Sequence, residues 1–194
     1  SNSYIHIDIG FLTAFLSKDK DFTTDENVVT LYVPENAKFQ NATLNSDLGN
    51  ILLNHVCFES GTVSSGDGDI FIKNSTLKEV AVSASLGDVK TYDSKIKTCN
   101  FVLSDGDFTA KNNEFTGETL INDDLGDIEV QGSKKQWSSL GVDASTDLGD
   151  IEVSETLEGT LKEKDSDESE YQRSGKNGKV KLHAEDGDIT MKCN

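Results

Sequence analysis

Apolar and polar residues alternate on both sides of a Gly-Asp/Asn-apolar triplet that occurs seven times in the chain. The triplets begin at Gly49, Gly68, Gly87, Gly106, Gly126, Gly149 and Gly187. Seven residues before the apolar member of each triplet stands another apolar residue: Leu44, Val63, Val82, Phe101, Ile121, Ala144 and Leu182. The residues between these positions are mostly polar. Alternation with a period of two around a fixed glycine predicts strands that bury one face, with these apolar positions in the core.

The spacing of the triplets is 19, 19, 19, 20, 23 and 38 residues. A unit of this length holds about two strands and their turns. It is too short for a propeller blade of roughly 40 residues or for a strand-helix-strand unit. Stacked units bury a continuous core that one unit cannot bury alone. The pattern therefore predicts an all-β parallel β-solenoid of about 7–8 coils, in which each triplet glycine forms a structural turn.

The remaining segments predict how a single domain, residues 1–194, is organised. Residues 1–30 are expected to form an N-terminal cap strand and the approach to the first coil, because Ser3 to Gly10 alternates like a strand. Residues 31–159 hold the regular coils, and Val28 to Val33 resembles the strand of the first one. The last spacing is twice the period. We assign the excess to an acidic loop insertion at 160–178, which is almost free of apolar residues, followed by closing strands at 179–194.

Charge and cysteine content exclude several partners. The chain has 35 acidic and 18 basic residues and a formal net charge of -17, so its surface repels nucleic acid and anionic lipid. The longest apolar run, Phe11 to Leu16, is too short to cross a bilayer. We therefore expect no nucleic-acid partner and no direct membrane insertion by this segment. Cys57, Cys99 and Cys193 have neither zinc-site nor disulfide-framework spacing.

The aspartates of the triplets are the main candidates for chemistry. In a solenoid, Asp69, Asp88, Asp107, Asp127, Asp150 and Asp188 would stack about one strand spacing apart. Like charges at that distance repel by about 1 kcal/mol in water. Turn chemistry, in which each carboxylate accepts backbone N–H groups beside a glycine, is the interpretation that we favour. The alternative is bound calcium, a cation that prefers carboxylate oxygens. We expect no cofactor. If calcium were bound, these six aspartates would be its candidate ligands.

Catalytic patterns are weak in this sequence. His6, His55 and His183 stand in no HExxH frame, and no GxSxG motif is present. Acidic pairs are too frequent to identify a glycosidase. The prediction is that the protein is not an enzyme. The acidic segment 160–178 is the candidate element for binding a partner.

The motifs also resemble a known family. The recurrent SxxGDIxV-type turns, together with the stretches Val28 to Leu53 and Tyr171 to Lys192, are similar to the bacterial DUF4097/DUF2807 "putative adhesin" families of β-strand repeat proteins. The resemblance covers nearly the whole chain from about Ser3. It implies a β-solenoid at the bacterial cell envelope, often joined to a membrane anchor or to other domains, without established catalytic residues. The chain departs from the pattern by its acidic insertion and by Asn50 in the first triplet.

Together, these observations predict a non-catalytic cell-envelope module that binds a protein or glycan through its strand faces and loops. We expect it at the cell surface or otherwise outside the cytoplasm, held by an anchor outside this sequence. One alternative is a sensing or regulatory scaffold in an envelope-stress system. A second alternative, from a different class, is a carbohydrate-active solenoid enzyme.

Overall fold

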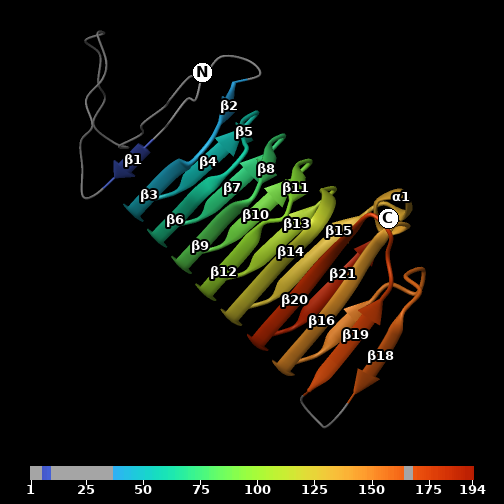
Figure 1. The fold of residues 1–194 in the computed structure, drawn as a ribbon. Helices are drawn as coiled ribbons and strands as arrows, with labels where there is room; N and C mark the ends of the chain where they lie inside the picture. Colours follow the sequence, from blue (N-terminus) through green and yellow to red (C-terminus); the bar gives the residue numbers. More distant parts are fainter. Residues whose placement is uncertain (1–5, 10–36, 164–167) are drawn as a thin grey trace, which may run out of the picture.

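The chain winds into stacked coils of two or three short strands each (Figure 1). The computed structural model describes residues 6–9, 37–163 and 168–194. One regular coil consists of β6 (Gly61–Asp67), β7 (Ile70–Lys73) and β8 (Thr76–Lys78). Each of these strands pairs in parallel with the equivalent strand of the neighbouring coils. Three strands separated by three corners give such a coil three sides, which we name sheets A, B and C. The last three coils have strands in sheets A and C only.

The sheets are defined by their strands in spatial order. Sheet A contains β1 (His6–Ile9), β3 (Ala42–Leu48), β6, β9 (Val80–Leu86), β12 (Asn100–Asp105), β14 (Glu114–Leu125), β20 (Gly178–Asp186), β16 (Leu140–Leu148), β19 (Ser169–Arg173) and β18 (Thr160–Glu163). Sheet B contains β2 (Lys38–Phe39), β5 (Cys57–Phe58), β8, β11 (Lys95–Lys97) and the start of β14. Sheet C contains β4 (Ile51–Asn54), β7, β10 (Val89–Tyr92), β13 (Phe108–Lys111), β15 (Ile128–Gly132), β21 (Ile189–Cys193) and β17 (Ile151–Val153).

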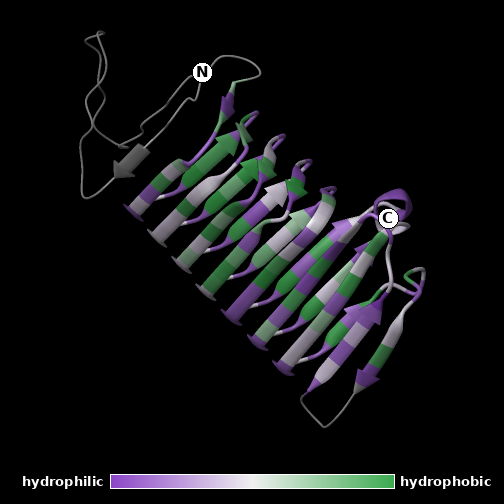
Figure 2. Ribbon diagram, viewed as in Figure 1, coloured by the Kyte–Doolittle hydropathy of each residue, from purple (hydrophilic) through white to green (hydrophobic). Residues whose placement is uncertain are grey.

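The core is built from columns of inward-facing side chains, one residue per coil and sheet. On sheet A, Val63, Val82, Phe101, Ile121, Leu182 and Ala144 are neighbours in register, and all are buried. Leu44 extends this column and packs against the core while remaining partly exposed. Between sheets, the rings of Phe101 and Phe108 meet edge to face with centroids 5.1 Å apart. Figure 2 shows the alternation of apolar and polar residues along the strands.

The two corners that lack the triplet glycine turn through residues with positive φ. One corner uses His55, Asn74, Asp93 and Asn112, with φ between 48° and 57°. The other uses Asn41, Glu79 and Thr98, with φ between 43° and 54°. Asparagine and aspartate tolerate this left-handed conformation better than most residues do. The corner position of His55 agrees with a turn role rather than a ligand role.

The order of coils in space differs from their order in the sequence. β20 pairs with β14 on one side and with β16 on the other, and β21 lies between β15 and β17 in the same way. The final coil of the chain therefore occupies the place between the two coils that precede it. The closing strands at the C-terminus do not end the solenoid, because the last coil is inserted into the stack.

A short helix lies in the link that bypasses the inserted coil. The link from β15 to β16 must pass the edge of the inserted coil, and it does so through α1 (Lys134–Trp137). Ser133 and Gln136 form a capping box that starts the helix. The Trp137 indole is buried and donates its Nε1–H to the carbonyl of Lys192, 3.0 Å away, in the inserted coil. Within the described ranges, no helix is long and apolar enough to span a membrane.

The segment 160–178 differs from the predicted acidic loop. It contains β18 and β19, which form an antiparallel hairpin, and β19 also pairs antiparallel with β16. The Tyr171 side chain is buried, and its hydroxyl donates to the carbonyl of Glu158 at 3.1 Å. An edge hairpin buries one face of few residues, so it needs little apolar sequence. It covers the open edge of sheet A, as a solenoid end requires.

At the other end, β1 pairs in parallel with β3. This strand lies within the segment Ser3 to Gly10, whose alternation predicts a strand. The predicted first-coil strand at 28–33 lies outside the described residues. The prediction of an all-β parallel β-solenoid is confirmed by the pairing of the coils.

Candidate binding surfaces

The Gly-Asp corner joins sheets A and C and requires glycine for two reasons. Gly87 and Gly106 both have φ of +140°, a conformation that residues with a side chain rarely adopt. The coils also approach closely here. A Cβ on Gly87 would lie 2.6 Å from the carbonyl oxygen of Gly68, and a Cβ on Gly106 would lie 2.4 Å from that of Gly87. The repeated glycine is therefore a consequence of stacking one corner on the next.

The aspartates of this corner form a ladder of hydrogen bonds. In each step the Oδ1 atom accepts the backbone N–H of the corresponding aspartate in the next coil. The ladder runs through Asn50, Asp69, Asp88, Asp107, Asp127, Asp188 and Asp150, with N···O distances of 2.8 to 3.0 Å. Asn50 starts the ladder because an amide oxygen accepts the same bond. The geometry is that of turn chemistry.

The hydrogen bonds that Asp88 accepts favour its ionised form. Partial burial opposes ionisation of Asp88, but the Lys90 ammonium, 2.6 Å from Oδ2, and the Asp107 N–H outweigh this effect. The pKa of Asp88 is therefore below its ordinary value. In the part of the chain that the structure describes, no three His, Cys, Asp or Glu side chains gather in a way that could hold a metal ion. The six calcium candidates are placed in single file rather than around one point.

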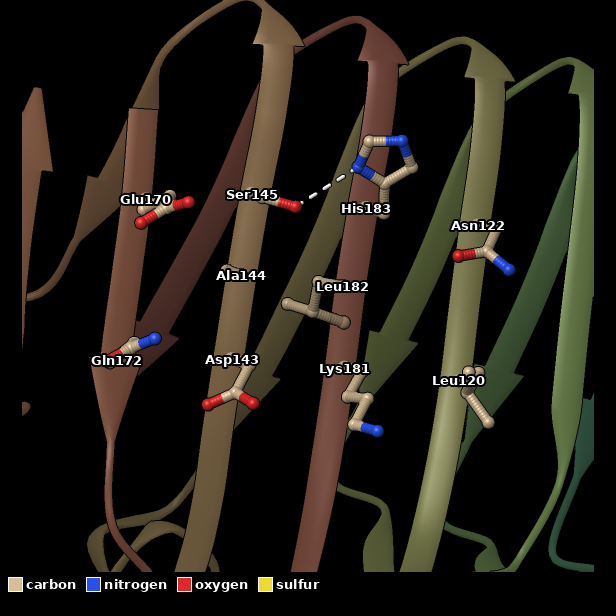
Figure 3. Close-up of a pocket in the computed structure, with 10 residues that line it drawn as sticks. All are labelled: Leu120, Asn122, Asp143, Ala144, Ser145, Glu170, Gln172, Lys181, Leu182 and His183. Atoms are coloured by element: carbon tan, nitrogen blue, oxygen red, sulfur yellow. Dashed lines mark hydrogen bonds between the residues drawn. The ribbon is translucent and has the colours of Figure 1, made fainter. Parts of the chain in front are cut away.

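A second surface lies on the outer face of sheet A, where the inserted coil meets its neighbours. It is a shallow groove of about 290 Å³ across β14, β20, β16 and β19 (Figure 3). Its lining consists of Leu120, Asn122, Asp143, Ala144, Ser145, Glu170, Gln172, Lys181, Leu182 and His183. The Lys181 ammonium pairs with Glu118 at 3.0 Å, and Asp143 pairs with Lys179. The groove is lined by both apolar and polar groups and carries both signs of charge.

Within the groove, Ser145 Oγ lies 3.1 Å from Nδ1 of His183. The registers place His183 beside Ser145 and place Glu170 on the opposite side of Ser145. A Ser-His-acid triad needs the histidine between the serine and the acid, whereas here the serine is in the middle. Ser145 and His183 can hydrogen-bond a polar ligand. The strand that carries the serine separates the acid from the histidine, so this arrangement is not that of a nucleophilic serine with an oriented base. Sequence reasoning missed this pair because 38 residues separate its members.

Asp123 is a buried acid that sequence reasoning also missed. It faces the core of sheet A between Leu103 and Ala184, with 1% of its surface exposed. Both carboxyl oxygens lack a hydrogen-bond partner among the described residues. Burial, reinforced by the charges of Asp107, Asp124, Asp127 and Asp105, raises the pKa of Asp123 to about 7. Its position two residues after Ile121 in an alternating strand is the signal that places it inward.

The cysteines do not form a site. Cys57, Cys99 and Cys193 are all free thiols. Cys99 is buried directly before β12, and burial raises the pKa of its thiol. Burial together with Glu59 raises the pKa of Cys57. Thiols of this kind are less reactive than exposed ones.

These features define a class of protein: a three-sided parallel β-solenoid whose coils turn at stacked Gly-Asp corners. The chain belongs to the family described as Toastrack DUF4097, whose pattern matches residues 12–192. A solved structure from Clostridium sporogenes, titled as a "putative cell adhesion protein", is similar at 12% sequence identity and a TM-score of 0.42, over 78% of this chain and 92% of that chain. No curated protein matches the sequence.

Proposed function

We propose that the protein is a non-catalytic module of the bacterial cell envelope that binds another protein along its solenoid. The observation that supports this is a set of large apolar side chains held in the open at repeated positions. Leu48, Leu86, Leu125 and Leu148 are each more than half exposed, and all four stand at the same place in their coils. Scattered exposed leucines need no explanation, but an ordered set on a rigid scaffold is typical of an interaction surface.

The rigidity of the scaffold supports the same proposal. Each coil is fixed by backbone pairing to both neighbours and by the Asp ladder. Outward side chains therefore keep a constant spacing, and binding to them orders little of the chain. The extracytoplasmic location and the membrane anchor expected from the family belong to this proposal as well.

Capture from an envelope extract tests the proposal. The chain is immobilised and exposed to the envelope fraction of a bacterium that encodes it, with and without EDTA. We expect a discrete protein to be retained in both arms, and retention of nothing would overturn the binding role. A parallel assay measures release of reducing ends from envelope polysaccharides. Turnover above the background would overturn the non-catalytic assignment and favour the solenoid enzyme.

A further inference from the structure

The strands of sheet A end in a column where leucine and aspartate alternate. In spatial order its members are Leu48, Asp67, Leu86, Asp105, Leu125, Asp186 and Leu148, each in register with the next. We call this set the leucine–aspartate column. Its leucines are 52% to 54% exposed, and its aspartates are exposed as well. Successive leucines lie two coils apart, which is about 9.6 Å.

Carboxylates flank the leucine–aspartate column on both sides. In four of the seven coils the preceding position carries an exposed acid (Asp47, Asp124, Glu185 or Asp147), and in the other three it carries Gly66, Ser85 or Ser104. The aspartate ladder lies two residues further along the chain in each coil, and its Asp88 is paired with Lys90. A partner that buries the leucines must therefore bring positive charge between and beside its own apolar groups. An apolar partner without basic residues would bury these carboxylates uncompensated, which is costly.

The spacing of the column favours one backbone conformation, helix or strand, in such a partner. An α-helix lying along the solenoid presents one side chain per turn, every 5.4 Å, close to the coil spacing of about 4.8 Å. An extended strand presents side chains on one face only every 6.8 Å or so. In a helix, positions seven apart are about 10.5 Å apart, close to the leucine spacing of about 9.6 Å.

We propose that the leucine–aspartate column docks a basic amphipathic α-helix of a partner protein, in which apolar residues and Lys or Arg alternate on successive turns. This inference rests on the proposed binding function and states which surface performs it. The leucines span six coil steps, about 29 Å, which corresponds to a helix of about 19 residues. The difference of about 0.6 Å per turn is taken up by the flexible lysine, arginine and leucine side chains.

A synthetic helix is the probe. The peptide has 21 residues in three heptads, with leucine at the first position and lysine at the fourth and fifth, and a fluorescent label. A second peptide has the same composition with leucine and lysine redistributed around the helix. Binding to the full chain is measured by fluorescence anisotropy at low and high salt. We expect the first peptide to bind at least about tenfold more tightly than the second, with affinity that falls as salt rises.

Matched variants locate the site. Leu86→Ser with Leu125→Ser removes two central leucines of the column, and we expect about a tenfold loss of affinity. Leu52→Ser is the control, because Leu52 is 67% exposed on β4 of sheet C, outside the column. It should change the affinity less than about twofold. Far-UV circular dichroism verifies that each variant keeps the strand content of the parent.

Several results would overturn the inference. Equal binding of the two peptides would do so, and so would equal binding to the parent chain and the double variant. Self-association of the chain that the double variant abolishes, without any peptide binding, would assign the column to a second copy instead. In the capture experiment, equal retention of a partner by the parent chain and the double variant would contradict the docking site but agree with the proposed binding function. If no protein is retained by the parent chain, the proposed binding function itself is contradicted.

Discussion

Asp123 should make the stability of the protein depend on pH in the opposite direction to Asp88 and Glu129, whose pKa values are lowered. The perturbation is Asp123→Asn, which keeps the shape of the side chain and removes its charge. In the folded protein the carboxyl is buried without a partner, and its pKa is about 7, against an ordinary value of 3.8. The neutral amide imitates the protonated acid. The variant therefore shows what the ionised carboxylate costs.

The sign and size follow from proton linkage. Below pH 3.8 the acid is protonated in both the folded and the unfolded chain, so its charge costs nothing. As the pH rises from 3.8 to about 7 the unfolded chain ionises first, and the free energy of unfolding falls by about 1.4 kcal/mol per pH unit. Above pH 7 both states are ionised and the loss stays constant, at about 4 kcal/mol. The expected advantage of Asp123→Asn is thus roughly 1.5 kcal/mol at pH 5 and about 4 kcal/mol at pH 8.

The assay is urea unfolding of the parent chain and the variant at several pH values between 5 and 8. Other carboxylates titrate in both proteins, so the difference between the two curves reports Asp123. Asp47→Asn is the matched control, because Asp47 is exposed on β3, at the position equivalent to Asp124, and is not among the charges that raise the pKa of Asp123. It should change the free energy of unfolding by less than about 0.5 kcal/mol at every pH. If Asp123→Asn is less stable than the parent at pH 8, the carboxylate has a stabilising partner and the desolvation argument is wrong.

Three further predictions concern the coils. Phe101→Asp places a charge in the core and should lower the free energy of unfolding by more than about 3 kcal/mol. Val102 faces outward on the same strand, so Val102→Asp should cost under about 1 kcal/mol. Equal losses of stability for the two variants in thermal melts would refute the column assignment. Gly87→Ala should lower the free energy of unfolding by at least about 2 kcal/mol, because the new Cβ would meet the Gly68 carbonyl. Ser85 is exposed on β9, so Ser85→Ala should melt like the parent chain. Asp107→Ala removes the acceptor for the Asp127 N–H and should lower the free energy of unfolding by about 1 kcal/mol. Asp107→Asn keeps an oxygen that accepts this hydrogen bond and should melt like the parent chain. If EDTA lowers the melting temperature of the parent chain, the result favours calcium at the ladder instead.

The periodic part of the fold could be predicted because it depends on local chemistry repeated in every coil. The triplet glycine, the inward position of Phe101 and the outward position of Lys90 all follow from period-two alternation around a close-packed turn. The hairpin at 160–178 could not be predicted in this way. Its stability comes from backbone pairing with the edge of β16 and from single contacts such as that of Tyr171, which leave little pattern in the sequence.

The candidate surfaces depend on which coils are neighbours, and that is a property of the whole chain. Ser145 and His183 meet because β16 and β20 pair. Asp123 is covered on one side by Ala184 for the same reason, since β14 also pairs with β20. A parallel coil satisfies the backbone of any similar neighbour, so alternation alone does not say which coil lies next to which.

The leucine–aspartate column nevertheless carries information about this order. In the order of the sequence its last three members are Leu125, Leu148 and Asp186, which would place two leucines side by side. In the observed stack Asp186 lies between them, and the alternation that begins at Leu48 continues without a break to Leu148. Insertion of the last coil thus separates two exposed leucines by a charge and limits the contiguous apolar area. The same insertion gives the edge a uniform two-coil repeat of about 9.6 Å, which the heptad spacing of a helix, about 10.5 Å, approaches.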